Sequence, residues 1–175
     1  MAVGHTLDLE LLSNFAALPE FVETAPTFAE NSAGKALYYS RHCDDKVFAD
    51  DSGLVVSALD GAPGVLSARY AGAGASDKER NAKLLRELRG KTGAERAARF
   101  VCIITVALRG RARVVVSGEV NGFIVEEARG AGGFGYDPVF YFPELQRTFA
   151  ELTAEEKNIH SHRGKAFRRM MEALK

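Results

Sequence analysis

The chain has 175 residues, of which 46% are hydrophobic and 26% charged, and this composition suits one globular domain with a sizeable core. Its 23 basic and 23 acidic side chains balance, which argues against a general surface for nucleic-acid polymers or anionic membranes but leaves room for a local basic pocket. Cys43 and Cys102 lack metal-ligand spacing and are expected to be reduced core thiols, and the absence of a membrane-spanning run or a signal peptide favours a cytoplasmic location.

The first third of the chain predicts a strand and a helix. Residues 7–11 alternate between apolar and polar, as a half-buried strand does. Thr27 and Glu30 have the spacing of a capping box, so we expect a helix that begins there, carries Lys35 and ends near His42. Its apolar stripe would be formed by Phe28, Ala29, Ala33, Ala36, Leu37 and Ser40.

A doubled carboxylate follows the next predicted strand. Residues 47–49 form a short buried run that ends at residues 50–53, and the apolar run resumes at residues 54–56. Adjacent strand residues point to opposite faces, so we expect Asp50 and Asp51 to serve different purposes. A carboxylate at the end of a buried strand must be solvated, hydrogen-bonded or metal-bound, and Mg²⁺ is the cation that carboxylates and substrate phosphates hold together. The alternative is that both aspartates only cap a turn.

The middle of the chain predicts a turn, a helix and an antiparallel meander. Residues 61–64 have turn chemistry, and a capping box at Ser76 and Glu79 opens a helix that ends before Gly90. Residues 100–108 are almost continuously apolar and β-branched, as a central strand buried on both faces would be. A second strand would follow at residues 114–116, and a break at Gly118 would lead to a third strand that runs through Val125. Both connections are too short for parallel crossovers.

Residues 130–138 are rich in glycine and predict a tight loop between two apolar flanks. Phe134 and Tyr136 are large for turn residues, so we expect them to meet a flat ligand. The alternative is a glycine-rich hairpin whose aromatic rings fold back on the core. A strand would follow at residues 138–142.

The C-terminal region predicts two helices. A capping box at residues 153–156 opens the first, which carries Lys157. Ser161 is a plausible cap of the second, so that His162 and Arg163 lie in its first turn, where the helix dipole disfavours cations. A bound anion would reconcile this conflict; the alternative is that Arg163 reaches a nearby glutamate. Three other histidines are expected to be surface or packing residues: His5, His42 and His160.

Helices and strands interleave around the meander, and no repeat or linker divides them, so the sequence predicts a single α/β domain over residues 1–175 with a mixed sheet. Seven motifs together closely resemble the Ham1/inosine triphosphate pyrophosphatase family, the XTP/dITP diphosphatases that cleanse nucleotide pools. The resemblance extends from about Leu7 to the C-terminus in the family's order. The motifs are FAEN at 28–31, ADDSG at 49–53, GAPG at 61–64, SARY at 67–70, GGFGYDP at 132–138, ELT with EK at 151–157, and SHRG at 161–164.

The resemblance implies hydrolysis of noncanonical purine triphosphates to a monophosphate and pyrophosphate. Glu30 and Asp51 would hold Mg²⁺, and Asp51 would also orient or deprotonate the attacking water. Lys35 and Ser52 would lie against substrate oxygens, and Phe134 would stack on the purine. The other nucleotide contacts would come from Gly135, Tyr136, Asp137, Lys157, His162 and Arg163. Donors on this C-terminal side would suit a purine with a keto group at C6.

The implied fold is a long mixed sheet flanked by helices, with two lobes and a cleft between them, and the implied assembly is a homodimer. Members of the family begin with a strand and a Thr/Ser-x-Asn-x-x-Lys loop, and neither occurs before Leu7. We therefore expect that the true start lies upstream, or that this chain lacks its first strand and part of its phosphate site. Two other interpretations stay open: a nucleotide-binding or dimerisation module without turnover, and a related pyrophosphatase for modified pyrimidine or methylated nucleotides.

Overall fold

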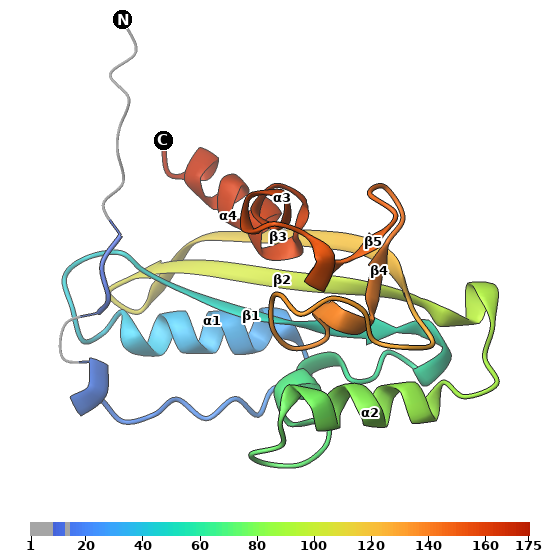
Figure 1. Cartoon of the computed structure of the whole chain (residues 1–175). Coiled ribbons are helices and arrows are strands. Elements are labelled where there is room, and N and C mark those ends of the chain that lie inside the picture. The colour runs from blue at the N-terminus through green and yellow to red at the C-terminus, as the bar shows by residue number, and fades with distance from the viewer. Residues whose placement is uncertain (1–8, 13–14) are drawn as a thin grey trace, which may run out of the picture. The chain divides into compact units, whose positions relative to one another are not determined.

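The computed structural model of this chain describes residues 9–12 and 15–175, and Figure 1 shows its helices and strands. The chain divides into two compact units, as a two-lobed fold predicts. The first unit contains Asp51 and the residues before it, together with Ile103–Ser117 and Ala166–Lys175. The second unit contains Ser52–Cys102 and Gly118–Lys165.

Helix α1, Phe28–Tyr39, belongs to the first unit and begins where the sequence predicts. The Thr27 hydroxyl accepts a hydrogen bond from the Glu30 N–H at 3.2 Å and so caps the helix. The predicted apolar stripe is wrong in part, because the polar residues Asn31 and Ser32 are buried on this helix. Their burial is tolerated because each side chain takes part in two hydrogen bonds within the unit.

Two strand predictions near the N-terminus are wrong. Residues 9–12 form neither helix nor strand, while Leu7, Asp8 and also His5 lie outside the described residues. Strand β1 runs without interruption over Val47–Val56, so residues 50–53 are not a turn. Pairing with the neighbouring strand of the sheet overrides the turn preference of Asp, Ser and Gly at these positions.

In the described part of the chain one sheet has five strands in the order β1-β2-β3-β4-β5. The other four strands are β2 (Ala97–Leu108), β3 (Arg111–Ile124), β4 (Phe140–Phe142) and β5 (Arg147–Thr148). Arg109 and Gly110, both at positive φ, form the tight turn between β2 and β3. Antiparallel pairing joins β3 to β4 and β4 to β5. The predicted α/β fold, a sheet with flanking helices, is confirmed. The expectation of a mixed sheet is wrong for the described strands, because their pairing is antiparallel.

Strand β3 replaces the two strands that the sequence predicts after the first hairpin. Gly118, where we expected a break, lies inside β3 and is buried. Gly122 shows what a glycine does in this strand: a Cβ atom there would lie 2.3 Å from the Tyr141 carbonyl oxygen. This glycine therefore lets β4 approach β3 closely and marks no turn.

Helix α2, Asp77–Glu87, and helix α3, Ala154–His160, belong to the second unit and begin at the predicted capping boxes of Ser76 and Thr153. Helix α4, His162–Ala173, begins directly after Ser161, whose hydroxyl accepts from the Gly164 N–H at 3.1 Å. None of the helices in the described chain is long and apolar enough to cross a membrane.

The core of the second unit combines aromatic and aliphatic side chains. Its largest members are Leu54, Leu84, Leu88, Phe100, Ile124, Tyr136, Phe140, Phe142 and Phe149. Cys102 is buried in β2 and Cys43 is half-buried, and neither forms a disulfide. The prediction of a core thiol is therefore confirmed for Cys102 and only half met by Cys43.

Candidate functional site

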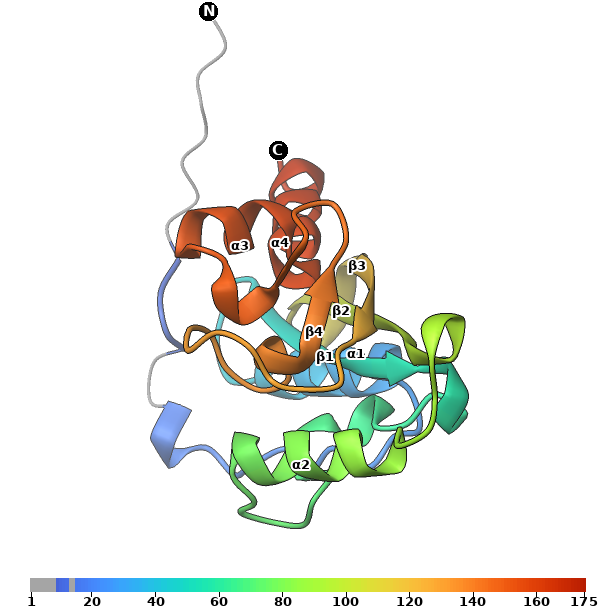
Figure 2. The ribbon, with the colours of Figure 1, turned by 45° about the vertical axis from the view of Figure 1, so that its right-hand side comes forward.

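The glycine-rich stretch between β3 and β4 is a loop, drawn in orange in Figure 2. Phe134 lies between two glycines at positive φ, Gly133 at 73° and Gly135 at 63°, a conformation that side chains other than glycine rarely adopt. A Cβ atom at Gly133 would lie 2.1 Å from Oδ2 of Asp137. The loop therefore needs glycine to wrap this closely around a carboxylate.

Asp137 holds the loop from inside and is only 2% exposed. Its Oδ2 accepts a hydrogen bond from the Phe134 N–H at 2.8 Å and forms an ion pair with Nζ of Lys157, from α3. Burial raises the pKa of the Asp137 carboxyl above its ordinary value, although the bonds from Lys157 and from the Phe134 N–H act in the opposite direction. The carboxylate is thus costly to keep charged, and the lysine ammonium group is held in place beside it.

The ring of Phe134 is 60% exposed and lies near two cations. Nζ of Lys157 lies 4.2 Å from the ring centroid, and Cζ of Arg163 lies 5.7 Å from it, both within the range of a cation–π interaction. Arg163 also donates from Nη2 to the Ser52 hydroxyl at 3.1 Å. The second unit therefore brings together four of the predicted residues: Ser52, Phe134, Lys157 and Arg163.

Two other predicted residues of this unit have side chains in the core. The ring of His162 is stacked on Phe100, with 4.6 Å between centroids and 10° between planes. The Tyr136 ring is 4% exposed, and its hydroxyl donates to the Ser67 carbonyl oxygen at 2.9 Å. The expectation that Tyr136 meets a flat ligand is wrong for its ring, because the ring packs in the core; for Phe134 the ring is exposed.

The first unit carries the remaining predicted residues, Glu30, Lys35 and Asp51. The exposed Glu30 carboxylate lies in the first turn of α1 and accepts from the Thr27 hydroxyl at 2.7 Å. The Lys35 ammonium group forms an ion pair with Glu23, a partner that sequence reasoning missed. Asp51 lies in β1 and is 9% exposed. Its neighbour Asp50 points to the opposite face of the strand.

Carboxylate oxygens from Glu30 and Asp51 are ligands that a hard divalent cation prefers. The near-complete burial of Asp51 fits this use, because a buried carboxylate requires compensation by hydrogen bonds or positive charge. Among residues 9–12 and 15–175, no cluster of three or more His, Cys, Asp or Glu side chains could hold a metal ion. A cation on these two carboxylates would complete its coordination with water or substrate oxygens.

Comparison with known proteins places the chain in a family. A family model described as the Ham1 family matches residues 2–173. This chain belongs to the Ham1 family. It is 52% identical to the dITP/XTP pyrophosphatase of Geobacillus kaustophilus, over 95% of this chain and 81% of that protein. It is 48% identical to the dITP/XTP pyrophosphatase of Geobacter sulfurreducens, over 98% of this chain and 86% of that protein.

Solved structures of the Ham1 family have the same fold. The Ham1 protein of Staphylococcus aureus matches with a TM-score of 0.87 and 41% identity, over 93% of this chain and 83% of that one. The nucleoside-triphosphatase, dITP/XTP pyrophosphatase, of Mycobacterium abscessus matches with a TM-score of 0.77 and 39% identity, over 92% of this chain and 84% of that one. The Ham1 resemblance drawn from seven short motifs is therefore confirmed over nearly the whole chain.

Proposed function

We propose that this chain hydrolyses the noncanonical purine triphosphates ITP, dITP and XTP to the nucleoside monophosphate and pyrophosphate. One observation carries the proposal: in a Ham1-family chain whose relatives are named dITP/XTP pyrophosphatases, an exposed phenylalanine ring lies beside two cations. A purine stacks on such a ring whatever its substituents. The cations then determine which substituents are accepted.

Selection among purines follows from donors on the second unit. Lys157 and Arg163 carry N–H donors and no acceptor. A keto oxygen at C6 of hypoxanthine or xanthine accepts from such donors, whereas the amino group of adenine would leave them without a partner. Ser52, Asp137 and His162 complete this side of the site, Asp137 by holding Lys157. Gly135 and Tyr136 contribute by shaping the loop that carries Phe134, because Gly135 lies at positive φ and the Tyr136 ring belongs to the core.

Hydrolysis itself is assigned to the first unit. Water adds its oxygen to one phosphorus of the α–β anhydride, the anhydride bond breaks, and the proton of the water passes to Asp51 and then to solvent. Glu30 and Asp51 would hold Mg²⁺, which would neutralise charge on the phosphate oxygens. Lys35 lies against substrate oxygens and adds positive charge. The buried setting of Asp51 supports its role, since a carboxylate shielded from bulk water interacts more strongly with a cation.

The homodimer expected from the family stays a prediction, as do the cleft between two lobes and the cytoplasmic location. For the proposed chemistry the relevant partners are a purine triphosphate and Mg²⁺. The balanced charge of the chain again argues against binding of a nucleic-acid polymer.

The test is release of pyrophosphate from ITP, dITP and XTP with Mg²⁺, compared with ATP and GTP. We expect inosine monophosphate and pyrophosphate in equal amounts from ITP, slow turnover of ATP, and loss of activity when EDTA removes the metal. Release of inorganic phosphate, or equal rates with ATP and ITP, would contradict the proposal. Binding of ITP without any release would favour a nucleotide-binding module.

A further inference from the structure

The first two turns of α2 bind the peptide groups of Gly135, directly after Phe134. Oδ2 of Asp77 accepts a hydrogen bond from the Gly135 N–H at 2.6 Å, and Nδ2 of Asn81 donates to the Gly135 carbonyl oxygen at 3.0 Å. Asp77 and Asn81 are 58 and 54 residues away from Gly135 in the sequence. A distant helix therefore fixes both the donor and the acceptor of one loop residue.

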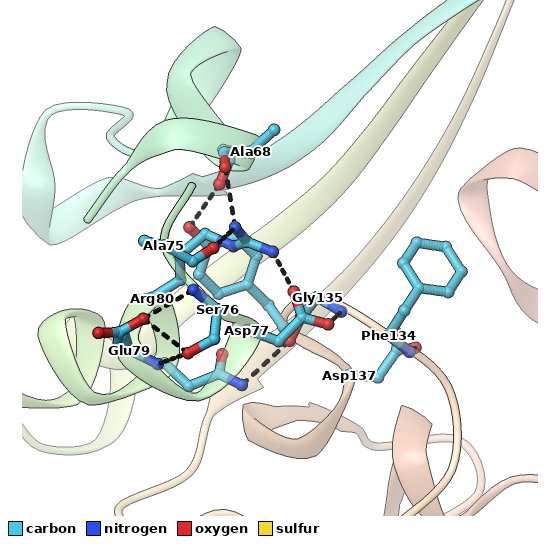
Figure 3. Close-up of polar contacts among 12 residues, drawn as sticks. Ala68, Ala75, Ser76, Asp77, Glu79, Arg80, Phe134, Gly135 and Asp137 are labelled. Carbon is cyan, nitrogen blue, oxygen red and sulfur yellow. Dashed lines mark hydrogen bonds and ion pairs between the residues drawn. The ribbon is translucent and has the colours of Figure 1, made fainter. Parts of the chain in front are cut away.

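Successive amides of the loop are bound by two different carboxylates. Asp137 accepts from the Phe134 N–H, and Asp77 accepts from the next N–H, that of Gly135. Figure 3 shows the Phe134 ring pointing away from these polar contacts. Since φ and ψ are the soft backbone dihedrals of a residue, bonds on both sides of Phe134 restrict the direction in which its ring is presented.

The other oxygen of the Asp77 carboxylate, Oδ1, is bound by Arg80. The Arg80 guanidinium forms an ion pair with Asp77 and donates to the Ala68 carbonyl oxygen at 2.9 Å and to the carbonyl oxygen of Ala75 (Figure 3). The arginine side chain is 17% exposed, so water screens this arrangement only in part. The carboxylate that binds Gly135 is thus oriented by an anchored cation.

Asn81 has a polar side chain at a buried position of α2. Its residue is 7% exposed, and its Oδ1 is buried without a hydrogen-bond partner among the described residues. An unsatisfied buried acceptor is destabilising. The Gly135 carbonyl needs a donor, so the amide group has a use at this position that an apolar side chain would lack.

We propose that Asp77 and Asn81 are positioning residues that hold Phe134 in place for the purine, an inference that rests on the proposed function. They touch neither phosphate nor metal in this scheme. Their loss should therefore weaken binding of the base and leave the chemical step nearly unchanged. It should also lower the discrimination between ITP and ATP, because a displaced ring no longer presents the base to Lys157 and Arg163.

The central experiment compares Asp77→Ala, Asp77→Asn and Ser76→Ala. Asp77→Ala removes the acceptor of the Gly135 N–H, so we expect KM for ITP to rise about tenfold, with kcat within about twofold. Asp77→Asn keeps an acceptor oxygen and should stay within about threefold of wild type. Ser76→Ala is the matched control, because it removes the cap of α2 but no contact with the loop. Calorimetric titration with inosine monophosphate gives the affinity without turnover.

Equal losses in Asp77→Ala and Ser76→Ala would overturn the inference, because they would mean that only the stability of α2 matters. Unchanged affinity for inosine monophosphate in Asp77→Ala would also overturn it. Asn81→Leu is a second test, because it removes the donor to the Gly135 carbonyl oxygen. This variant should bind inosine monophosphate more weakly even if its fold is more stable. An Asn81→Leu variant with full affinity would remove Asn81 from the proposal.

Hydrogen exchange separates this inference from the proposed function. In the nucleotide-free protein the Gly135 amide should exchange about tenfold faster in Asp77→Ala than in wild type, and Ser76→Ala should leave it unchanged. Exchange that does not respond to Asp77→Ala overturns the positioning role whatever the activity. If the exchange result holds while wild type fails to hydrolyse ITP, the proposed function is wrong and the role in selectivity falls with it.

Discussion

The candidate residues of α1 in the first unit and those around the glycine-rich loop in the second are supported over very different sequence distances. In the first unit, Glu30 accepts from Thr27 three residues away, and Lys35 pairs with Glu23 twelve residues away. In the second unit the corresponding contacts join residues far apart. Lys157 reaches Asp137 over 20 residues, Asp77 reaches Gly135 over 58, and Arg163 reaches Ser52 over 111.

This difference separates two kinds of function. Residues of the first unit are carried by a capped helix and a strand, so a substitution there should change chemistry with little movement of the backbone. Residues of the second unit hold one another and the loop, so a substitution there should change affinity and loop order together. Substitutions in each unit can therefore test this separation.

The largest effect is expected for Asp51→Asn in the first unit. The amide keeps the volume of the carboxylate but can neither accept the proton of water nor hold a cation by charge, so kcat with ITP should fall about a thousandfold. The fold should persist, and thermal unfolding should give a midpoint close to that of wild type. Near-wild-type turnover would refute the role of Asp51.

Asp50→Asn is the matched control for this variant. Asp50 neighbours Asp51 in β1 and faces the opposite side of the strand. The same chemical change there should leave kcat within about threefold of wild type. Equal losses in the two variants would mean that the charge of the strand matters and not the position of one carboxylate.

The next largest effect is expected for Phe134→Ala in the second unit. Loss of stacking on a base costs about 1–3 kcal/mol, so KM for ITP should rise strongly while kcat falls much less. Because the ring is 60% exposed, the free energy of unfolding should change little. Phe123→Ala, which removes a ring 40% exposed in β3, is the control and should leave KM unchanged.

The sequence was most informative where the structure is local. Capping boxes at Ser76 and Thr153 predicted the starts of two helices, because the residues that satisfy a helix end lie within one turn of it. The continuous strand through Asp50 and Asp51 was missed. Turn preference is also local, but here pairing with another strand outweighs it.

The long-range contacts around the glycine-rich loop could not be predicted from the sequence. Asp77 is the first residue of a capped helix, and an acidic residue there needs no explanation beyond the helix dipole. Nothing in its spacing from Gly135 indicates a hydrogen bond. Phe134 and Tyr136 are two residues apart and similar in type, yet only the fold assigns one to the surface and the other to the core. Once burial is known, a buried polar side chain with an unsatisfied atom, such as Asn81, indicates a residue with a role beyond packing.

A smaller effect is expected for Arg163→Ala. The variant loses one cation beside Phe134 and one hydrogen bond to Ser52, so the ratio of kcat/KM for ITP to that for ATP should fall about fivefold to tenfold. Lys157 still supplies a donor, which keeps the loss below that of Phe134→Ala. Arg169→Ala changes another exposed arginine of α4 and serves as the control. Full discrimination against ATP in Arg163→Ala would count against the assignment.

The smallest effect concerns the pH dependence of stability at Asp137. Burial raises the pKa of this carboxyl in the folded chain, so the folded state binds the proton more tightly than the unfolded state. The resulting stabilisation is complete below the unfolded pKa, about 4, and is lost as the pH rises through the raised folded pKa. Asp137→Asn cannot titrate, so the free energy of unfolding of wild type should decline relative to the variant over this range in urea titrations.

Glu156 provides a control of opposite sign for Asp137. The hydrogen bond from Arg147, at 2.6 Å, and that from the Thr153 N–H lower the pKa of the Glu156 carboxyl, so its stabilisation is present above the unfolded pKa and is lost as the pH falls. Relative to Glu156→Gln, wild type should therefore gain stability as the pH rises. The contrary outcome is that wild type also gains stability with pH relative to Asp137→Asn. That result would mean that the ion pair with Lys157 stabilises the Asp137 carboxylate by more than its burial destabilises it.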